Sequence, residues 1–390
     1  MSQFPPEIIE EIMLDAIQTH SSWLDLVDQR LQMSLVCRDW GTIATNFPSL
    51  WTTMTIRTYS SVKLLRLCVK NAKLSKLSIT LDIRHTEKAN WRGSHVIVKS
   101  RTPDEMEQML ADALAPASDR VEELVIQGGR ESETRQIIKW MVSYDWPTLH
   151  SITLSATLCD TRGQSLTFAN IHDISRLRIE RMHPLQNAQA LHQKITELHL
   201  DQTTHRHGGW ARLATVLEEC ARLTSLTMIQ LALAESDNHR RVKLLTLRKL
   251  MIHFTEDTGI SFMGNLEAPN LITLDIAAMG SGKLLDAVDA NPGAFETCEE
   301  ITLLQRTDVV ESTTSALRAM QQVRTLNIGY CGPGAVEALK MFVQEGRQLS
   351  RLERVQCGGI FDEEAMELIV KGQFSDTFAI EQNGRRITKK

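Results

Sequence analysis

Residues 223–228 read LTSLTM, residues 247–252 read LRKLMI and residues 271–276 read LITLDI. All three follow the pattern L-x-x-L-x-L when Ile and Met are allowed for Leu, and they start 24 residues apart. With Val and Cys also allowed, the same hexad starts at positions 74, 121, 149, 174, 195, 223, 247, 271, 298, 323 and 352. One hexad fits any half-buried strand, but a long series at steps of 21 to 29 residues indicates a repeat architecture.

Amphipathic helices are expected between the hexads. The clearest begins with Thr102 as a cap and Pro103 in the first turn, and continues through residue 114. Others are expected at 133–142, 209–220, 282–290, 313–322, 334–346 and 363–370. The first gap between hexads, from Leu74 to Val121, fits two repeat lengths, with a degenerate unit or an insertion near 91–100.

Strand, turn and helix in cycles of about 25 residues resemble the leucine-rich-repeat family over residues 74–371. The resemblance implies an α/β fold, a curved solenoid with parallel strands on its concave face and helices on its convex face. Many family members carry Asn or Cys three positions after the last apolar residue of the hexad. Only Cys331 matches here, so we expect that side-chain ladder to be largely absent.

Composition excludes several classes of protein. With 42% hydrophobic and 23% charged residues, the chain has the composition of a folded protein. A net charge of -5 argues against nucleic-acid binding and against anionic membranes, and no apolar run is long enough to span a bilayer. Acidic residues stand where a secretory signal needs a basic region, so we expect no signal peptide. Seven Cys without a CxxC pair indicate free, mostly buried thiols, and therefore a cytoplasmic and/or nuclear location.

Residues 1–57 carry no hexad and differ in charge from the rest. Seven acidic and two basic residues lie in the first 56, so the whole formal charge of -5 belongs to this segment. Pro5 and Pro6 can start a helix that carries an apolar stripe. A second helix is expected over 30–45, ended by residues 46–49.

This segment resembles the F-box, a helical motif of about 45 residues. The family pattern opens with L-P-x-E-I/L-I, continues with V-C-K/R-x-W and ends at Leu-Trp. The chain has FPPEII at 4–9, VCRDW at 36–40 and Leu50-Trp51, and departs from the pattern at Phe4 and in a longer loop over 19–30. The resemblance implies that the segment docks on the S-phase-kinase-associated (Skp-type) adaptor, which joins a cullin scaffold in a ubiquitin ligase. The expected adaptor-binding residues are Pro5, Pro6, Ile8, Ile9, Ile12, Leu35, Val36, Cys37, Arg38, Trp40, Leu50 and Trp51.

The predicted domains are the F-box at 1–57, a linker helix at 58–73, the solenoid of about 11 irregular repeats at 74–371 and a C-terminal tail at 372–390. The tail ends with four basic residues in six, which indicates a solvated end or a nuclear-import signal.

Residues between the apolar positions of a hexad point away from the core. Their charges are mixed in sign, which suits a protein or peptide target, although many could simply be solvated. The candidates for target binding are Arg176, Arg178, Glu180, Glu197, His199, Asp201, His253, Asp275 and Asn327.

Two motifs have alternative interpretations. His199, His205 and His207 are close enough for a metal site, but a turn between repeats explains them equally well. Gly329, Gly332 and Gly334 fit a turn between strand and helix better than a phosphate loop, because the Lys of a P-loop is missing. We therefore expect no metal and no cofactor.

No local signature of a catalytic site is present, so we expect a non-catalytic protein. The preferred hypothesis is the substrate-recognition subunit of an SCF-type cullin ubiquitin ligase, acting in ubiquitin-dependent protein degradation. The alternative is a leucine-rich-repeat scaffold whose N-terminal helices only cap the solenoid. An enzyme would need a convergent polar pocket that no local spacing reveals.

Overall fold

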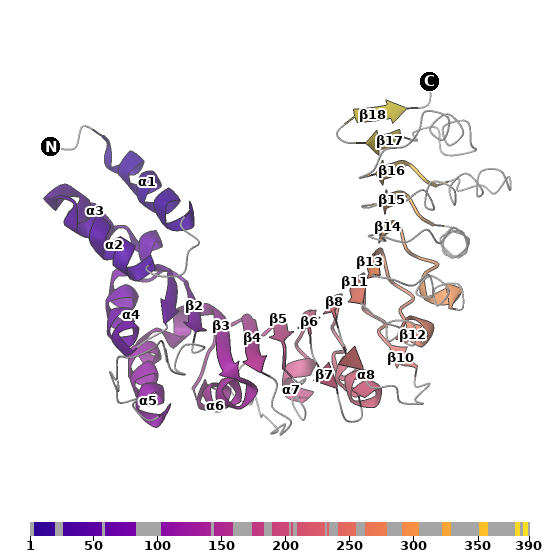
Figure 1. The fold of residues 1–390 in the computed structure, drawn as a ribbon, viewed down its shortest axis with the longest axis horizontal. Coiled ribbons are helices and arrows are strands. Elements are labelled where there is room, and N and C mark those ends of the chain that lie inside the picture. Colours follow the sequence, from indigo (N-terminus) through magenta and orange to yellow (C-terminus); the bar gives the residue numbers. More distant parts are fainter. Residues whose placement is uncertain are drawn as a thin grey trace, which may run out of the picture. The chain divides into compact units, whose positions relative to one another are not determined.

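The computed structural model of the chain describes residues 4–19, 26–56, 59–82, 103–141, 144–158, 174–182, 189–202, 204–205, 209–230, 232–233, 241–254, 262–278, 291–303, 322–328, 351–357, 379–382 and 385–388. They belong to two compact units, Met1–Leu191 and His192–Lys390. As predicted, the fold is α/β and built on parallel strands (Figure 1).

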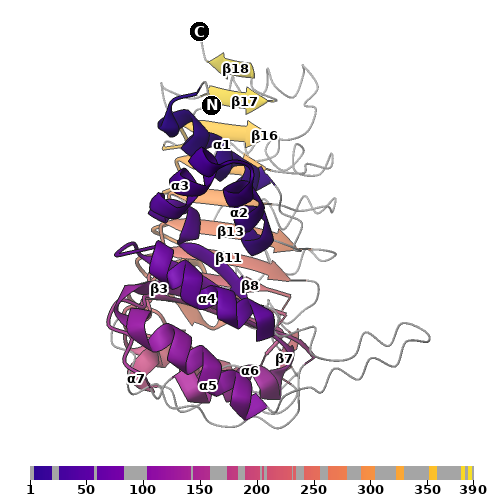
Figure 2. The same ribbon diagram turned by 90° about the vertical axis from the view of Figure 1, so that its left-hand side faces the viewer.

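The first unit begins with helices. They are α1 (Pro6–Thr19), α2 (Leu26–Leu35), α3 (Arg38–Asn46) and the 3-10 helix η1 (Pro48–Trp51), followed by strand β1 (Thr53–Ile56) and α4 (Tyr59–Asn71). Then come β2 (Leu77–Asp82), α5 (Pro103–Leu114), η2 (Ala115–Arg120), β3 (Val121–Arg130), α6 (Glu131–Met141), β4 (Ser151–Leu158) and β5 (Arg176–Glu180). The strands pair in the order β1-β2-β3-β4-β5, all parallel. Helix α4 packs beside α5 (Figure 2).

The second unit continues the same plan after the short helix α7 (Gln189–His192). It contains β6 (Glu197–Asp201), β7 (Thr204–His205), α8 (Gly209–Glu219), β8 (Ser225–Ile229), β9 (Ala232–Leu233), β10 (Val242–Lys243), β11 (Lys249–Phe254), β12 (Leu266–Glu267) and β13 (Thr273–Ala278). After η3 (Pro292–Ala294) follow β14 (Glu300–Leu303), β15 (Thr325–Ile328), β16 (Arg354–Cys357), β17 (Ala379–Gln382) and β18 (Arg385–Thr388).

In this unit the order is β6-β8-β11-β13-β14-β15-β16-β17-β18, parallel as far as β17, with β18 antiparallel. Two small pairs, β7-β9 and β10-β12, lie apart from the main sheet. Helix α8 and the pair β10-β12 lie on one side of the sheet, and no described helix covers the other side (Figure 1). Among the described residues, only strands therefore form that side of the unit.

Each of the eleven hexads coincides with one strand of these sheets, so the strand prediction is confirmed. The described apolar positions of the hexads are buried, with one exception. Leu74 is 91% exposed, although Leu77 and Ile79 of the same hexad are buried. The chain turns through a left-handed residue, Lys73 (φ 52°), between α4 and β2. This turn carries Leu74 away from the core.

The helices predicted near 102–114, 133–142 and 209–220 correspond to α5, α6 and α8, and the linker helix to α4. The helices predicted at 282–290, 313–322, 334–346 and 363–370, together with Cys331 and the glycines Gly329, Gly332 and Gly334, lie outside the described residues.

The single helix predicted over 30–45 is wrong, because α2 ends at Leu35 and α3 begins at Arg38. Cys37 has an extended backbone, with φ -159° and ψ 173°. Its Sγ accepts the backbone N–H of Trp40 at 3.5 Å and so caps α3. At Gly41 an added Cβ would come within 2.7 Å of the Ser34 carbonyl oxygen. The two helices therefore meet in a tight corner that needs glycine at this position.

Besides the small pairs β7-β9 and β10-β12, three strands in the main strand order were not predicted. β1 lies inside the expected F-box segment and adds an edge strand to β2. β17 and β18 lie in the expected solvated tail, and they extend the sheet by a parallel and then an antiparallel strand. In the first gap between hexads, β2 pairs directly with β3, so no strand of a degenerate repeat lies between them. Residues 83–102 of that gap lie outside the described part of the chain.

Threonine hydroxyls directly before some of the hexads connect successive repeats, a role that the sequence did not predict. In three repeats, the residue just before the hexad is Thr, and its Oγ1 donates to the carbonyl of the first residue of the preceding hexad. These bonds are Thr148 to Val121 (3.0 Å), Thr246 to Leu223 (2.8 Å) and Thr297 to Leu271 (2.8 Å). Threonine before the strand thus provides a ladder where Asn or Cys after the strand is missing.

We expect Thr246→Val combined with Thr297→Val to destabilise the second unit by about 0.5–1.5 kcal/mol per site, because each change leaves backbone carbonyls without their donor. Chemical unfolding followed by circular dichroism measures the effect. Thr273→Val is the control, because the hydroxyl of Thr273 makes no hydrogen bond within the described part of the chain. Equal stability of the double variant and the control would contradict the ladder.

Among the described residues, no helix has the length and apolar character needed to cross a membrane.

Candidate functional site

The N-terminal helices enclose a small core of their own. Ile9 and Met13 on α1 are buried, and so are Leu50 and Trp51 of η1. The indole N–H of Trp51 donates to the carbonyl of Ala44 at 2.7 Å. Leu50, Trp51 and Ile9, which are among the residues expected to bind the adaptor, are therefore internal in this structure.

The same helices leave several large apolar side chains in solvent. On α1, Ile8 is 41% and Ile12 is 43% exposed, and Phe4 just before the helix is 61% exposed. At the corner between α2 and α3, Leu35 is 81% and Val36 is 62% exposed. We call these five residues the head surface. They make up most of the exposed large apolar side chains in the described part of the chain, the others being Leu74, Leu245 and Ile272.

Five other residues predicted to bind the adaptor lie close in the chain to residues of the head surface. Pro5, Pro6, Cys37 and Arg38 are exposed, and Trp40 is half-buried. The periodicity of α1 separates the two sets, because Ile8 and Ile12 lie one turn apart and share a face, whereas Ile9 and Met13 point inward. A face of this kind on a small helical module is typical of an interaction site.

Arg30 joins the helical segment to the sheet. Its side chain is buried, and Nη2 donates to the carbonyl of Thr53 at the start of β1 at 2.5 Å. The guanidinium also lies against the thiol of Cys68 on α4, and burial lowers the pKa of Arg30. Helix α2, which ends at Leu35 of the head surface, is thus fixed to the first strand.

The described cysteines differ in accessibility. Cys68, Cys220 and Cys298 are buried free thiols, whereas Cys37 is exposed. Burial raises the pKa of Cys298 to about 12, and burial together with the Glu219 carboxylate raises that of Cys220 to about 12. These buried groups therefore stay protonated as well as shielded at neutral pH.

We expect Cys37 to react with iodoacetamide at pH 8 much faster than Cys68, Cys220 or Cys298, because alkylation needs an accessible thiolate. Peptide mass spectrometry of the native protein over time measures each rate. Denatured protein is the control, in which the four rates should converge. If Cys220 or Cys298 reacts in the native protein as fast as Cys37, the assigned burial is wrong.

The residues predicted for target binding lie on the outward side of the strands, as expected. In the first unit Arg176 and Arg178 are exposed and Glu180 is half-buried. In the second unit Glu197 is exposed, and the half-buried residues are His199, Asp201, His253, Asp275 and Asn327. The structure therefore places all nine on sheet faces, five of them half-buried residues of the second unit.

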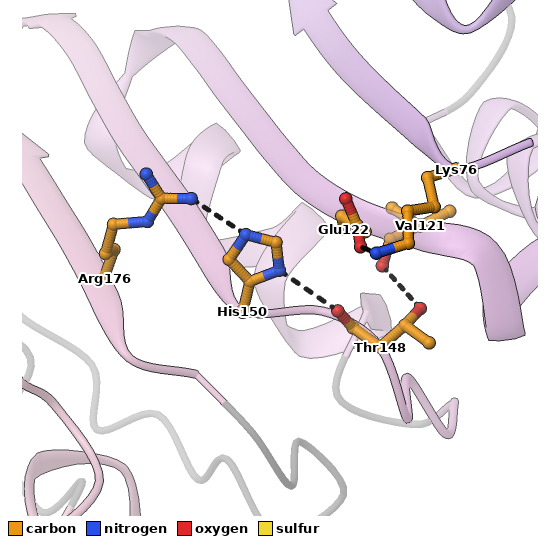
Figure 3. Close-up of polar contacts among 6 residues, drawn as sticks. All are labelled: Lys76, Val121, Glu122, Thr148, His150 and Arg176. Carbon is orange, nitrogen blue, oxygen red and sulfur yellow. Dashed lines mark hydrogen bonds and ion pairs between the residues drawn. The ribbon is translucent and has the colours of Figure 1, made fainter.

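A shallow groove of about 210 Å³ lies in the first unit, at the edge of the sheet where the strands begin. It is lined by side chains that bind one another (Figure 3). Lys76 forms an ion pair with Glu122, and Ser78 donates to Glu123 at 2.8 Å. Because these groups are already engaged, this part of the groove connects neighbouring repeats rather than offering free groups to a ligand.

At the other end of the groove, the lining side chains are also hydrogen-bonded to neighbouring residues. Arg176 Nη2 donates to His150 Nε2 at 2.8 Å, and His150 Nδ1 donates to the carbonyl of Thr148 at 3.4 Å (Figure 3). Thr148 in turn belongs to the threonine ladder. Arg176, predicted to contact a target, is thus held by its own neighbours at this edge.

The possible metal site does not form in the described part of the chain. His205 lies in β7 and His207 lies outside the described residues. Among the described residues, no group of three His, Cys, Asp or Glu side chains could hold a metal ion.

A comparison of the chain with models of known protein families finds no match, and a comparison with curated proteins finds none that is similar.

Proposed function

We propose that the protein is the substrate-recognition subunit of an SCF-type cullin ubiquitin ligase. Residues 1–57 act as an F-box that binds a Skp-type adaptor, and the parallel-strand repeats, as an irregular leucine-rich-repeat solenoid, bind a target protein. Holding adaptor and target on one chain makes ubiquitin transfer by another subunit effectively intramolecular. The protein itself carries out no chemistry.

The observation that carries the proposal is the head surface. Phe4, Ile8, Ile12, Leu35 and Val36 are exposed on a segment that already has its own buried core. These side chains are therefore not needed to fold the segment, and their exposure costs solubility unless a partner covers them. The F-box resemblance provides the partner, since Ile8 and Val36 fall in the stretches that match the family pattern and the other three residues lie in or next to those stretches.

The buried position of Leu50 and Trp51 changes the expected interface. As buried residues they stabilise α3 from inside, through the bond from the Trp51 indole N–H to the carbonyl of Ala44. Contact with the adaptor is assigned to the head surface, together with the exposed Pro5, Pro6, Cys37 and Arg38.

One observation favours the second candidate, a scaffold without ligase activity. The segment also caps the sheet, because β1 pairs with β2 and Arg30 is bonded to Thr53. A cap alone, however, needs only the inward-facing residues. A cap does not need the side chains of Ile8 and Ile12, whereas the ligase subunit needs both for adaptor binding.

The test is co-purification of the full chain with a Skp-type adaptor, using Ile8→Asp combined with Ile12→Asp. We expect the double variant to weaken adaptor binding by about 2–4 kcal/mol, because two carboxylates would be buried in an apolar contact. Ile9 is left unchanged, since it is buried and its replacement would unfold the segment.

The matched control is Leu245→Asp combined with Ile272→Asp, which changes two apolar residues of the second unit that are 56% and 39% exposed. Adaptor binding should survive in the control. Undiminished binding of the Ile8/Ile12 variant, with unchanged circular dichroism, would refute the assigned interface. Equal loss in both variants would indicate non-specific association.

A further inference from the structure

Among the described residues of the second unit, large apolar side chains are exposed at one place. They are Leu245, which is 56% exposed, and Ile272, which is 39% exposed. Leu245 lies in the turn before β11, and Ile272 lies just before β13. Strands β11 and β13 are neighbours in the sheet (Figure 1), so both residues belong to the edge at which the strands begin.

Hydrogen bonds between repeats hold these two positions on one surface. Asn270 Nδ2 donates to the carbonyl of Leu245 at 2.8 Å, and the backbone N–H of Ile272 donates to the carbonyl of Arg248 at 2.8 Å. The turn that carries Leu245 is thus tied to the repeat of Ile272. The two apolar side chains therefore stand on a connected part of the edge.

Two arginines accompany these apolar residues. Arg222 directly precedes the hexad of β8, and Arg248 is the second residue of the hexad of β11. Both are exposed, and neither side chain forms a hydrogen bond or an ion pair within the described part of the chain. Thr246 Oγ1 donates to the carbonyl of Ala221 at 3.2 Å, which places Arg222 next to the turn of Leu245. We call Arg222, Leu245, Arg248 and Ile272 the edge surface.

Farther along the same edge, charged side chains pair with one another. Arg324, the second residue of its hexad, approaches Glu299 at 3.7 Å on one side and Glu353 at 4.0 Å on the other. Arg248 holds the same position in its own repeat, but its neighbours at that position are a threonine and Ile272. The adjacent repeats therefore supply no carboxylate to Arg248 at this position, whereas they supply two to Arg324.

We propose that the edge surface binds an acidic segment of a partner protein, in which Asp or Glu stands beside apolar residues. The carboxylates pair with the two arginines, and an apolar side chain packs on Leu245 and Ile272. Charge selects this occupant, because residues 238–255 contain five basic and no acidic residues. Burial of the exposed leucine and isoleucine adds affinity that ion pairs alone do not provide. The edge surface shares no residue with the head surface, so the inference is independent of adaptor binding.

The test uses the full chain and a fluorescein-labelled peptide, Gly-Glu-Leu-Glu-Leu-Glu-Gly, followed by fluorescence anisotropy. Three peptides of the same length have Gln for Glu, Lys for Glu, or Ser for Leu. We expect the Glu/Leu peptide to bind, with affinity falling as salt is raised, and the other three to bind at least about tenfold more weakly. Absence of binding by the Glu/Leu peptide overturns the proposal, as does equally tight binding of the Lys peptide.

Arg222→Gln combined with Arg248→Gln should weaken binding of the Glu/Leu peptide roughly tenfold, because two ion pairs are lost. The matched control is Arg351→Gln combined with Arg354→Gln, which removes the same charge from two exposed arginines at β16 in the same unit. Undiminished binding by the Arg222/Arg248 variant overturns the proposal. Equal loss in the control also overturns it, because net charge alone would then explain the binding.

Two further measurements address other occupants of the edge surface. One is flotation of the chain with vesicles of phosphatidylserine and phosphatidylcholine, and the other is sedimentation velocity of the chain alone. Capture by the vesicles without binding of the Glu/Leu peptide would make the occupant a membrane. Dimers that the Arg222/Arg248 variant abolishes would make it a second copy of the chain. Either result overturns the proposal.

The variants of the adaptor test separate the two interfaces. The chain with Ile8→Asp and Ile12→Asp should lose the adaptor but bind the Glu/Leu peptide like the wild type. The chain with Leu245→Asp and Ile272→Asp should keep the adaptor and lose the peptide, and undiminished peptide binding by this chain would overturn the edge surface. Failure of this inference and failure of the ligase-subunit proposal are therefore separate results.

Discussion

Replacement of Trp51 by Ala is expected to lower the free energy of unfolding of the first unit by about 3–5 kcal/mol. Trp51 is 1% exposed, and its indole N–H donates to the carbonyl of Ala44. The substitution removes one of the two fully buried tryptophan side chains described in the unit, the other being Trp146, and leaves a cavity beside α3. The Ala44 carbonyl also loses its donor, which adds to the cost.

Urea unfolding of the full chain, followed by circular dichroism, measures this effect as a shift of the first unit's transition. Val36→Ala is the control, because Val36 is 62% exposed and its truncation should change stability by less than about 0.5 kcal/mol. If Trp51→Ala left stability unchanged but reduced adaptor binding, Trp51 would be an interface residue as the sequence first suggested. The buried position of Trp51 in η1 would then be wrong.

The second large effect is expected at a buried ion pair in α6. Arg135 donates to Glu131 Oε1 through Nε at 2.8 Å and through Nη2 at 2.5 Å, one helical turn apart. The side chains are only 4% and 1% exposed. Arg135→Ala should destabilise the first unit by about 3–5 kcal/mol, because a buried carboxylate then lacks its guanidinium.

The same unfolding experiment provides a control on the surface. Arg66 approaches Asp112 at 3.9 Å, but the side chains are 62% and 52% exposed. Arg66→Ala should therefore cost less than about 1 kcal/mol. If Arg66→Ala and Arg135→Ala lowered the free energy of unfolding by the same small amount, the stabilising role assigned to the buried ion pair in α6 would be wrong.

The sequence predicted the strands well because each hexad repeats a physical requirement. Residues such as Leu226 and Met228 must be buried while Thr227 between them faces outward, and this alternation appears in the residue types. Neighbouring strands with the same pattern pair in register, as Leu226 does with Leu250. Local pattern and tertiary pairing therefore agree, and the parallel order followed from the sequence.

Strands β1, β17 and β18 do not follow the hexad pattern, and other local patterns in the sequence correspond to them. The β17–β18 hairpin is announced by Asn383-Gly384 between two short runs, AIEQ and RRIT, which is a strong hairpin signal. The basic charge of the tail instead favoured a solvated end, whereas residues 379–382 and 385–388 pair as strands. Strand β1 shows the alternation of Thr and apolar residues in TMTI, but at four residues it is too short to stand out.

The candidate site was predictable only in part, because a motif does not reveal which of its apolar residues are internal. Ile8 and Ile9 are adjacent and chemically identical, yet one is 41% exposed and the other is buried. Trp51 resembled an interface anchor by residue type, and its bond to Ala44 depends on the corner at Cys37, which helical periodicity did not predict. The approach of His253 Nε2 to Asp275 Oδ1, at 3.8 Å, joins neighbouring strands and has no local signal in the sequence.

The most direct test of the central claim is a calorimetric titration of the purified full chain with a Skp-type adaptor. The proposal predicts a complex of equal stoichiometry with a dissociation constant of about 1 μM or tighter and a negative heat-capacity change, because the exposed apolar residues of the head surface become buried. A folded wild-type chain that gives no heat of binding at any temperature, and that elutes apart from the adaptor in size-exclusion chromatography, would contradict it. Residues 1–57 would then be the cap of a repeat scaffold.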